Sequence, residues 1–144
     1  MSKGISYEDY LKAHGSLTYS NVGVSMLPLL RQGKDLFVVR KKGPERCCVG
    51  DVILYRRPPE HYVLHRIIQV RENDYVILGD NCIAKEYGIR DEDIIGVMTG
   101  FVRDGKEHST AEVGYRVYSS LWIYMAPVRI TLKKAWIRLR RIKH

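Results

Sequence analysis

The chain has 144 residues, of which 45% are hydrophobic and 28% are charged, and its formal net charge is +8. This length accommodates a single domain, and the composition excludes a chain that is disordered throughout. Residues 129–144 contain seven basic residues and no acidic one, whereas residues 1–128 carry a net charge of only +1. A near-neutral domain disfavours a DNA-binding domain with a basic folded surface. The basic C-terminal segment therefore needs a separate explanation.

The first element expected along the chain is a short helix. Ser6 is a typical N-cap, Glu8 lies in the first turn and Gly15 is a typical stop, so the pattern predicts a helix over residues 7–14. Short β-branched runs then alternate with turn residues, which is typical of strands. The expected strands cover residues 17–24, 35–41, 51–56, 61–71, 74–79 and 94–103. We therefore predict a mainly β core over residues 17–105.

The last part of the chain has a helical pattern instead. At 100° per residue, apolar residues fall on one face of a helix and basic residues on the other, with Ile137 and Lys143 as exceptions. The apolar face would contain Leu132, Ala135, Trp136, Leu139 and Ile142. We therefore expect a domain over residues 1–112, followed by a basic amphipathic helical segment over residues 113–144.

The cysteines and the hydropathy pattern indicate whether disulfides, a metal site or a membrane segment are expected. The three cysteines, Cys47, Cys48 and Cys82, fit neither a disulfide scaffold nor a four-ligand zinc site, so we expect free thiols and no cofactor. The N-terminus has no apolar signal-peptide region. The longest uncharged run, residues 117–128, would rise only about 18 Å as a helix, too short to cross a bilayer. We expect neither an N-terminal signal nor a transmembrane anchor.

Three features are candidates for chemistry, although each is commonplace alone. Ser25 follows an expected strand and precedes a turn restricted by Pro28. His65 lies within the expected strand 61–71, and a neutral imidazole is a natural base for a serine hydroxyl. The turn Gly79-Asp80-Asn81 carries a carboxylate that can orient such a histidine.

In combination these motifs resemble a known family. The ordered set is Ser25-Met26-Leu27-Pro28, Gly50-Asp51-Val52-Ile53-Leu54-Tyr55, Leu64-His65-Arg66-Ile67-Ile68, Gly79-Asp80-Asn81 and Asp93-Ile94-Ile95-Gly96-Val97-Met98-Thr99-Gly100-Phe101. In order and spacing it resembles the signal peptidase I family over about residues 20–103. The resemblance implies an all-β catalytic core related to that of the LexA-type self-cleaving repressors.

The resemblance also implies roles for individual residues. The archaeal and endoplasmic-reticulum branch has histidine where other members have lysine, and this sequence has His65 there. By this resemblance Ser25 is the nucleophile, His65 is the general base and the Ser25 N–H contributes to the oxyanion hole. Either Asp80 or Glu86 would orient the histidine. We favour a supporting role for Asp80, and the choice between the two stays open.

The segment around the serine is expected to contact the substrate. Gly23 lies two residues before Ser25, where some family members supply a hydroxyl to the oxyanion hole, and Met26 and Pro28 complete this segment. The sequence departs from the family pattern at Lys34, at Lys85-Glu86 and in lacking the usual N-terminal anchor.

These observations predict a serine endopeptidase that cleaves a leader-like or signal-like peptide through a Ser–His pair. The family preference implies small side chains before the cleaved bond and an extended substrate that pairs with an edge strand. Two alternatives stay open. One is a LexA-like regulatory protein that cleaves only itself, and the other is a non-catalytic binding module on the same fold.

The basic C-terminal segment suggests a second partner. Basic residues on one face with Leu, Trp and Ile on the other are typical of interfacial helices, so we expect residues 129–144 to contact an anionic membrane surface. This predicts a peripheral membrane protein, on the cytoplasmic side. A solvated basic helix and a nucleic-acid contact are the less favoured interpretations.

Overall fold

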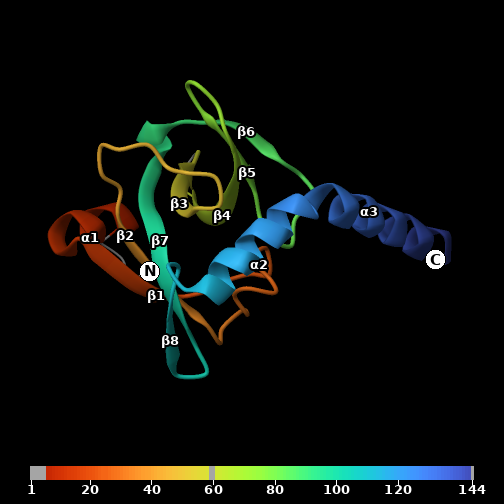
Figure 1. Cartoon of the computed structure of the whole chain (residues 1–144), viewed down its shortest axis with the longest axis horizontal. Coiled ribbons are helices and arrows are strands. Elements are labelled where there is room, and N and C mark those ends of the chain that lie inside the picture. The colour runs from red at the N-terminus through yellow and green to blue at the C-terminus, as the bar shows by residue number, and fades with distance from the viewer. Residues whose placement is uncertain (1–5, 59–60, 144) are drawn as a thin grey trace.

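A computed structural model describes residues 6–58 and 61–143 (Figure 1). The first five residues of the expected domain, residues 59 and 60, and the last residue of the expected C-terminal helix lie outside the described residues. The protein is mainly β, with a short N-terminal helix and a helical C-terminal segment, as predicted from the sequence.

The N-terminal helix, α1 (Tyr7–His14), begins and ends where the sequence predicted. The Ser6 side chain accepts a hydrogen bond from the Asp9 N–H at 3.0 Å and so satisfies one of the free amides of the first turn. Gly15 ends the helix with φ of 79°, a left-handed conformation that glycine adopts without strain. Leu11 is the buried residue of α1 and anchors the helix to the core.

In the described part of the chain, eight antiparallel strands form one sheet, in the order β1-β2-β7-β3-β4-β5-β6, with β8 paired to β7. The strands are β1 (Ser16–Ser20), β2 (Leu36–Lys41), β3 (Val52–Arg57), β4 (His61–Val70), β5 (Tyr75–Leu78), β6 (Glu86–Ile89), β7 (Ile94–Arg103) and β8 (Lys106–Ser109). A short 3-10 turn, η1 (Asp91–Asp93), precedes β7. The strand expected over residues 17–24 was predicted too long, because it ends at Ser20, and neither β6 nor β8 was predicted.

The pairing of β4 changes along its length. Its first half, from His61 to Arg66, pairs with β3, whereas its pairing with β5 begins only at Arg66 and continues to Val70. Buried clusters pack on both sides of the sheet. One contains Met26, Leu29 and Leu30, which come from the loop after β1 and fix that loop to the core.

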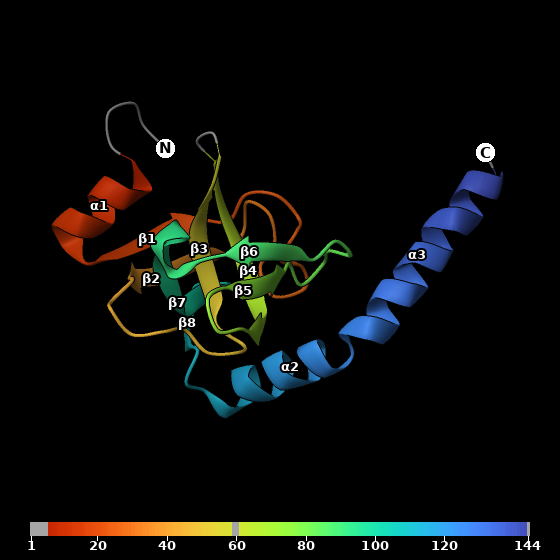
Figure 2. The same ribbon diagram turned by 90° about the horizontal axis from the view of Figure 1, so that it is seen from above.

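Two helices follow the sheet, α2 (Val113–Tyr124) and α3 (Ala126–Lys143), separated by an elbow at Met125 (Figure 2). Tyr115 and Tyr118 of α2 pack against the core, so α2 lies along the domain. The far end of α3 projects away from it, as Figure 2 shows. Among the described residues, no helix is both long and apolar enough to cross a membrane.

A buried ion pair connects the sheet to α2. Arg66 of β4 forms two hydrogen bonds with Asp80, of 2.7 and 2.9 Å, and both side chains are only 1% exposed. The Tyr118 hydroxyl donates to the same carboxylate at 2.7 Å, and the Ser119 hydroxyl accepts from Arg66 at 2.7 Å. These contacts give every charged atom of the pair a partner, which a buried charge requires.

Removing one partner of this buried ion pair should strongly destabilise the folded protein. We expect Asp80→Ala to lower the free energy of unfolding by about 3–5 kcal/mol, because it leaves the Arg66 charge buried without its partner. Urea denaturation followed by circular dichroism measures this change. The matched control is Asp74→Ala, which breaks the exposed pair with Arg71 and should change stability far less. Equal losses for the two variants would contradict a structural role for the buried pair.

Candidate active site

An open groove of about 940 Å³ brings together three of the seven site residues singled out from the sequence, Ser25, His65 and Glu86. Ser25 comes from the loop after β1, His65 from β4 and Glu86 from the start of β6. The turn after β5 contributes Asn81, and α3 contributes Lys133. Segments far apart in the sequence therefore meet around one serine and one histidine.

The loop that carries Ser25 is held by the turn after β5. The Asn81 N–H donates to the Ser25 carbonyl at 2.8 Å, and the Asn81 side-chain amide donates to the Val24 carbonyl at 3.0 Å. Next to the serine, Met26 is buried, and its sulfur accepts the Asp80 N–H at 3.4 Å. The half-buried serine is thus fixed on both sides by residues of one turn.

The His65 ring lies close to this loop. A Cβ added to Gly79 would be 2.9 Å from His65 Nε2 and 2.8 Å from the Ser25 carbonyl oxygen, so both groups surround Gly79. A side chain there would displace one of them, which explains why the turn has glycine at this position. Within the described residues the Ser25 hydroxyl makes no hydrogen bond, so it is not bonded to the imidazole in this structure.

The other ring nitrogen of His65 faces Glu86 and a tyrosine. Nδ1 is 3.3 Å from the Tyr55 hydroxyl and 3.6 Å from Glu86 Oε1. The Tyr55 hydroxyl donates to Glu86 Oε1 at 2.7 Å, and Arg57 forms an ion pair with the same oxygen. Because the tyrosine proton goes to the carboxylate, its oxygen is free to accept from Nδ1–H. This arrangement leaves Nε2 unprotonated on the side of Ser25.

Burial keeps His65 neutral. The side chain is mostly enclosed, and this loss of solvation lowers the pKa of His65 below its usual value of 6.5, although the charge of Glu86 acts in the opposite direction. Burial together with the hydrogen bond to Glu86 raises the pKa of Tyr55, so that hydroxyl stays protonated as a donor. At neutral pH the imidazole is therefore available as a base.

Cys82 also contacts the histidine. Its sulfur is 4.0 Å from His65 Nε2 and 3.8 Å from the Ser25 carbonyl oxygen. Burial raises the pKa of the Cys82 thiol above its usual value, which keeps it protonated and weakens it as a nucleophile. No pattern in the sequence predicts that this cysteine lies beside the histidine.

The remaining residues singled out from the sequence lie outside the groove. Asp80 forms an ion pair with Arg66, whereas Glu86 is the carboxylate that lies 3.6 Å from His65 Nδ1. Met26 is in the core, and Gly23, with φ of 85°, shapes the loop. Pro28 follows a cis peptide bond and lines a separate hollow beside α2.

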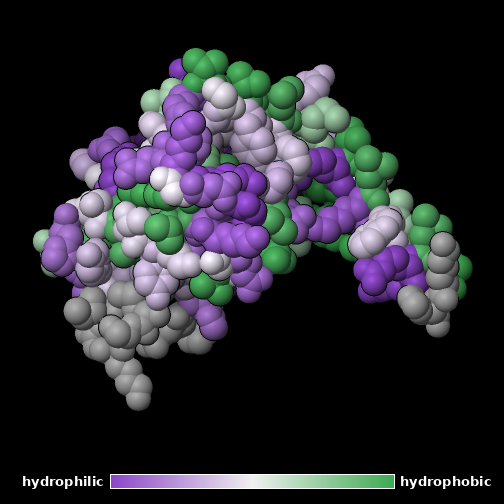
Figure 3. Space-filling model, turned by 90° about the horizontal axis from the view of Figure 1, so that it is seen from below, coloured by the Kyte–Doolittle hydropathy of each residue, from purple (hydrophilic) through white to green (hydrophobic). Residues whose placement is uncertain are grey.

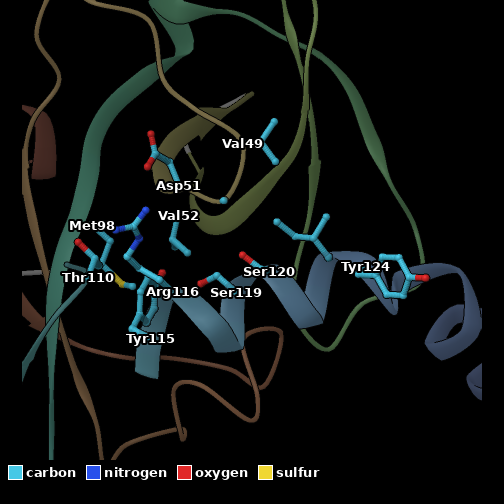
Figure 4. A pocket seen from close by; sticks show the side chains of 12 residues that line it. Val49, Asp51, Val52, Met98, Thr110, Tyr115, Arg116, Ser119, Ser120 and Tyr124 are labelled. Atoms are coloured by element: carbon cyan, nitrogen blue, oxygen red, sulfur yellow. The ribbon is translucent and has the colours of Figure 1, made fainter. Parts of the chain in front are cut away.

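A second cavity, of about 520 Å³, lies between α2 and the loop before β3 (Figure 4). Its lining includes Asp51, Arg116 and two serines of α2. One of these, Ser119, already accepts a hydrogen bond from Arg66, and no histidine is among the described residues that line this cavity. A serine without a base is a poor nucleophile, so the groove beside His65 is the better candidate for catalysis.

In the part of the chain that the structure describes, no cluster of three or more His, Cys, Asp or Glu side chains is arranged to hold a metal ion. Comparison with protein-family models, curated proteins and solved structures finds no match to this chain.

The charge balance around His65 predicts its titration. We expect the pKa of His65, followed by NMR of its ring protons, to lie below 6.5 and to fall further in Glu86→Gln, because the carboxylate that favours the imidazolium is lost. Since the folded pKa is the lower one, His65 should also reduce stability as the pH falls below its unfolded value of about 6.5.

The matched control for this titration is Glu92→Gln, which removes an exposed acidic side chain elsewhere. It should leave the His65 titration unchanged. If Glu86→Gln raised the pKa of His65, the charge of Glu86 would not be what opposes burial at this ring.

Proposed function

We propose that this protein is a serine endopeptidase of the signal-peptidase type, with Ser25 as nucleophile and His65 as general base. The observation that carries the proposal is the placement of His65 in an open groove. One ring nitrogen lies beside the Ser25 loop, and the other lies beside Tyr55 and Glu86. This arrangement supports the proposal, because a carboxylate beside one ring nitrogen can orient a histidine toward a serine.

The proposed reaction passes through an acyl-enzyme. Nε2 of His65 takes the proton of the Ser25 hydroxyl as its oxygen attacks the carbonyl carbon of the peptide bond. The His65 imidazolium then gives that proton to the leaving amine, and a water molecule releases the acyl group with His65 again as base. Across the described ranges 6–58 and 61–143, the Ser25 N–H makes no hydrogen bond, so it is free to stabilise the oxyanion.

The shape of the groove favours an extended peptide as substrate. Tyr62, Val63 and Leu64 of β4 line it, and this half of the strand lies before the point where β5 begins to pair. A peptide added alongside would continue the sheet, with backbone hydrogen bonds leading up to His65. By the family resemblance, small side chains would precede the cleaved bond.

Substitution of the two central residues tests the mechanism. We expect Ser25→Ala and His65→Ala each to lower kcat/KM by at least about a thousandfold, because the nucleophile and its base act as one unit. The measurement uses a library of internally quenched peptides with alanine at the first and third positions before the cleaved bond. Equal cleavage by wild type and both variants would refute the proposal.

Cys82 provides the control for this experiment. If serine is the nucleophile, Cys82→Ala should retain activity near the wild-type level. Loss of cleavage in Cys82→Ala with full activity in Ser25→Ala would instead assign the chemistry to the thiol, which lies 4.0 Å from His65 Nε2.

The absence of a hydrogen bond on the Ser25 hydroxyl within the described residues supports one alternative function, a peptide-binding module without turnover. Such a module would bind the same peptides with the same affinity in wild type and Ser25→Ala, and it would release no product. Mass spectrometry of the purified chain separates a third outcome, cleavage of the protein by itself, which corresponds to the LexA-like alternative.

We also propose that α3 lies on an anionic membrane surface. Leu132, Trp136 and Leu139 are 65%, 55% and 58% exposed. Figure 3 shows hydrophobic residues along the outer side of the projecting helix α3. Exposed basic residues, including Lys134 and Arg138, flank this stripe, and anionic headgroups would attract them while the apolar side chains enter the interface.

Substitution of the stripe tests this second proposal. We expect Leu132→Ser/Trp136→Ser/Leu139→Ser to lower partitioning onto vesicles of phosphatidylglycerol and phosphatidylcholine by at least about tenfold, since each residue loses its apolar burial. Co-sedimentation measures partitioning. The control, Val113→Ser/Val117→Ser, changes exposed residues of α2 and should bind like wild type. Equal partitioning of wild type and the stripe variant would contradict the proposal.

A further inference from the structure

Lys133 of α3 makes its contacts inside the groove. Its ammonium group donates to the backbone carbonyl of Asn81 and, at 3.1 Å, to the Asn81 side-chain oxygen. From the sequence, Lys133 belonged to the polar face of an amphipathic helix. In the structure it is half-buried and lines the same groove as Ser25 and His65.

Asn81 links Lys133 to the loop that carries Ser25. Both acceptor oxygens of Asn81 receive hydrogen bonds from Lys133, and both of its donor groups are used on the serine loop. The backbone N–H goes to the Ser25 carbonyl at 2.8 Å, and the side-chain amide goes to the Val24 carbonyl at 3.0 Å. A cation on the acceptor side of an amide polarises it and strengthens the bonds that its N–H groups donate.

A second residue of α3 holds the neighbouring position of the turn. Arg129, one helical turn before Lys133, donates to the Asp80 carbonyl at 3.0 Å and to the Trp122 carbonyl at 2.8 Å. The second of these bonds ties the start of α3 to the end of α2. The helix is therefore docked on the turn after β5 through Arg129 and Lys133, and the partner of Lys133, Asn81, is the residue that donates to the Ser25 carbonyl.

We propose that Lys133 is a positioning residue for the proposed peptidase reaction: by fixing Asn81, it holds the Ser25 loop against His65. The inference rests on the proposed role of Ser25. Lys133 would act on the turnover step and not on substrate affinity, because its hydrogen bonds go to Asn81. A small displacement of a nucleophile is sufficient to slow its attack strongly.

Steady-state kinetics on a cleaved quenched peptide test the assignment. We expect Lys133→Met to lower kcat by about tenfold and to leave KM nearly unchanged, because a charge-assisted contact that positions the nucleophile is lost. Lys133→Arg, which can still donate to both Asn81 oxygens, should restore most of kcat. The matched control, Lys134→Met, removes an exposed positive charge from the next position of α3 and should change neither constant.

A double-mutant cycle with Asn81→Ala tests whether the two residues act together. If Lys133 works through Asn81, Lys133→Met should have little further effect on kcat in the Asn81→Ala background. Additive losses would overturn the proposal. So would a rise in KM at constant kcat in Lys133→Met, since that result would assign Lys133 to substrate binding. An unchanged kcat in Lys133→Met would overturn it as well.

Hydrogen exchange separates failure of this inference from failure of the proposed function. The Asn81 amide, which donates to Ser25, should exchange faster in Lys133→Met than in wild type or Lys134→Met, whether or not any peptide is cleaved. If Ser25→Ala is as active as wild type, the proposed function is wrong, and the exchange rates alone still test the Lys133 contact. Equal exchange rates in all three proteins would refute that contact.

Discussion

The buried ion pair between Arg66 and Asp80 is the constraint that aligns the two halves of the candidate site. Arg66 follows His65 directly in β4, and Asp80 precedes Asn81, which holds the Ser25 loop. A buried ion pair is weak support for stability, because desolvation offsets most of its attraction. Its value here is geometric. With both side chains only 1% exposed, neither partner can shift without leaving a charge unpaired, so His65 and the Ser25 loop keep one relative position.

The two acidic candidates differ in what already binds them. Both oxygens of Asp80 receive hydrogen bonds from Arg66, and Tyr118 adds a third, so the carboxylate of Asp80 is already used in the buried ion pair. Glu86 instead lies 3.6 Å from Nδ1 of His65, and it also accepts a hydrogen bond from Tyr55, whose hydroxyl is close to the same nitrogen. The sequence could not separate these acids, since the choice depends on β6 folding back to place Glu86 opposite Ile77. Nor could the sequence single out Tyr55, because a tyrosine within a strand is common and does not indicate a contact with a histidine.

The strands that were predicted from the sequence are those whose buried residues form an apolar pattern along the chain. β7 was predicted with its observed bounds, and β5 is buried throughout. The two missed strands have no such pattern. β8 is Lys-Glu-His-Ser, and β6 contains Gly88 with φ of 77°, a residue that usually marks a turn. Both are formed by hydrogen bonds to a neighbouring strand, a long-range contact that local periodicity does not record.

Ile137 was an exception to the amphipathic pattern of the C-terminal helix, and the structure supplies the reason. A helical wheel assumes that a helix has one partner, but α3 has two environments. Arg129, Lys133 and Ile137 lie at successive turns on the side toward the groove, whereas the stripe that contains Trp136 is exposed. Two of the seven basic residues in 129–144 therefore bind the turn beside Ser25. In the proposed membrane-bound state, at about 1 kcal/mol per basic residue near an anionic surface, the other five are left to attract lipid. A movement of α3 on the membrane would then also displace the turn that holds the Ser25 loop.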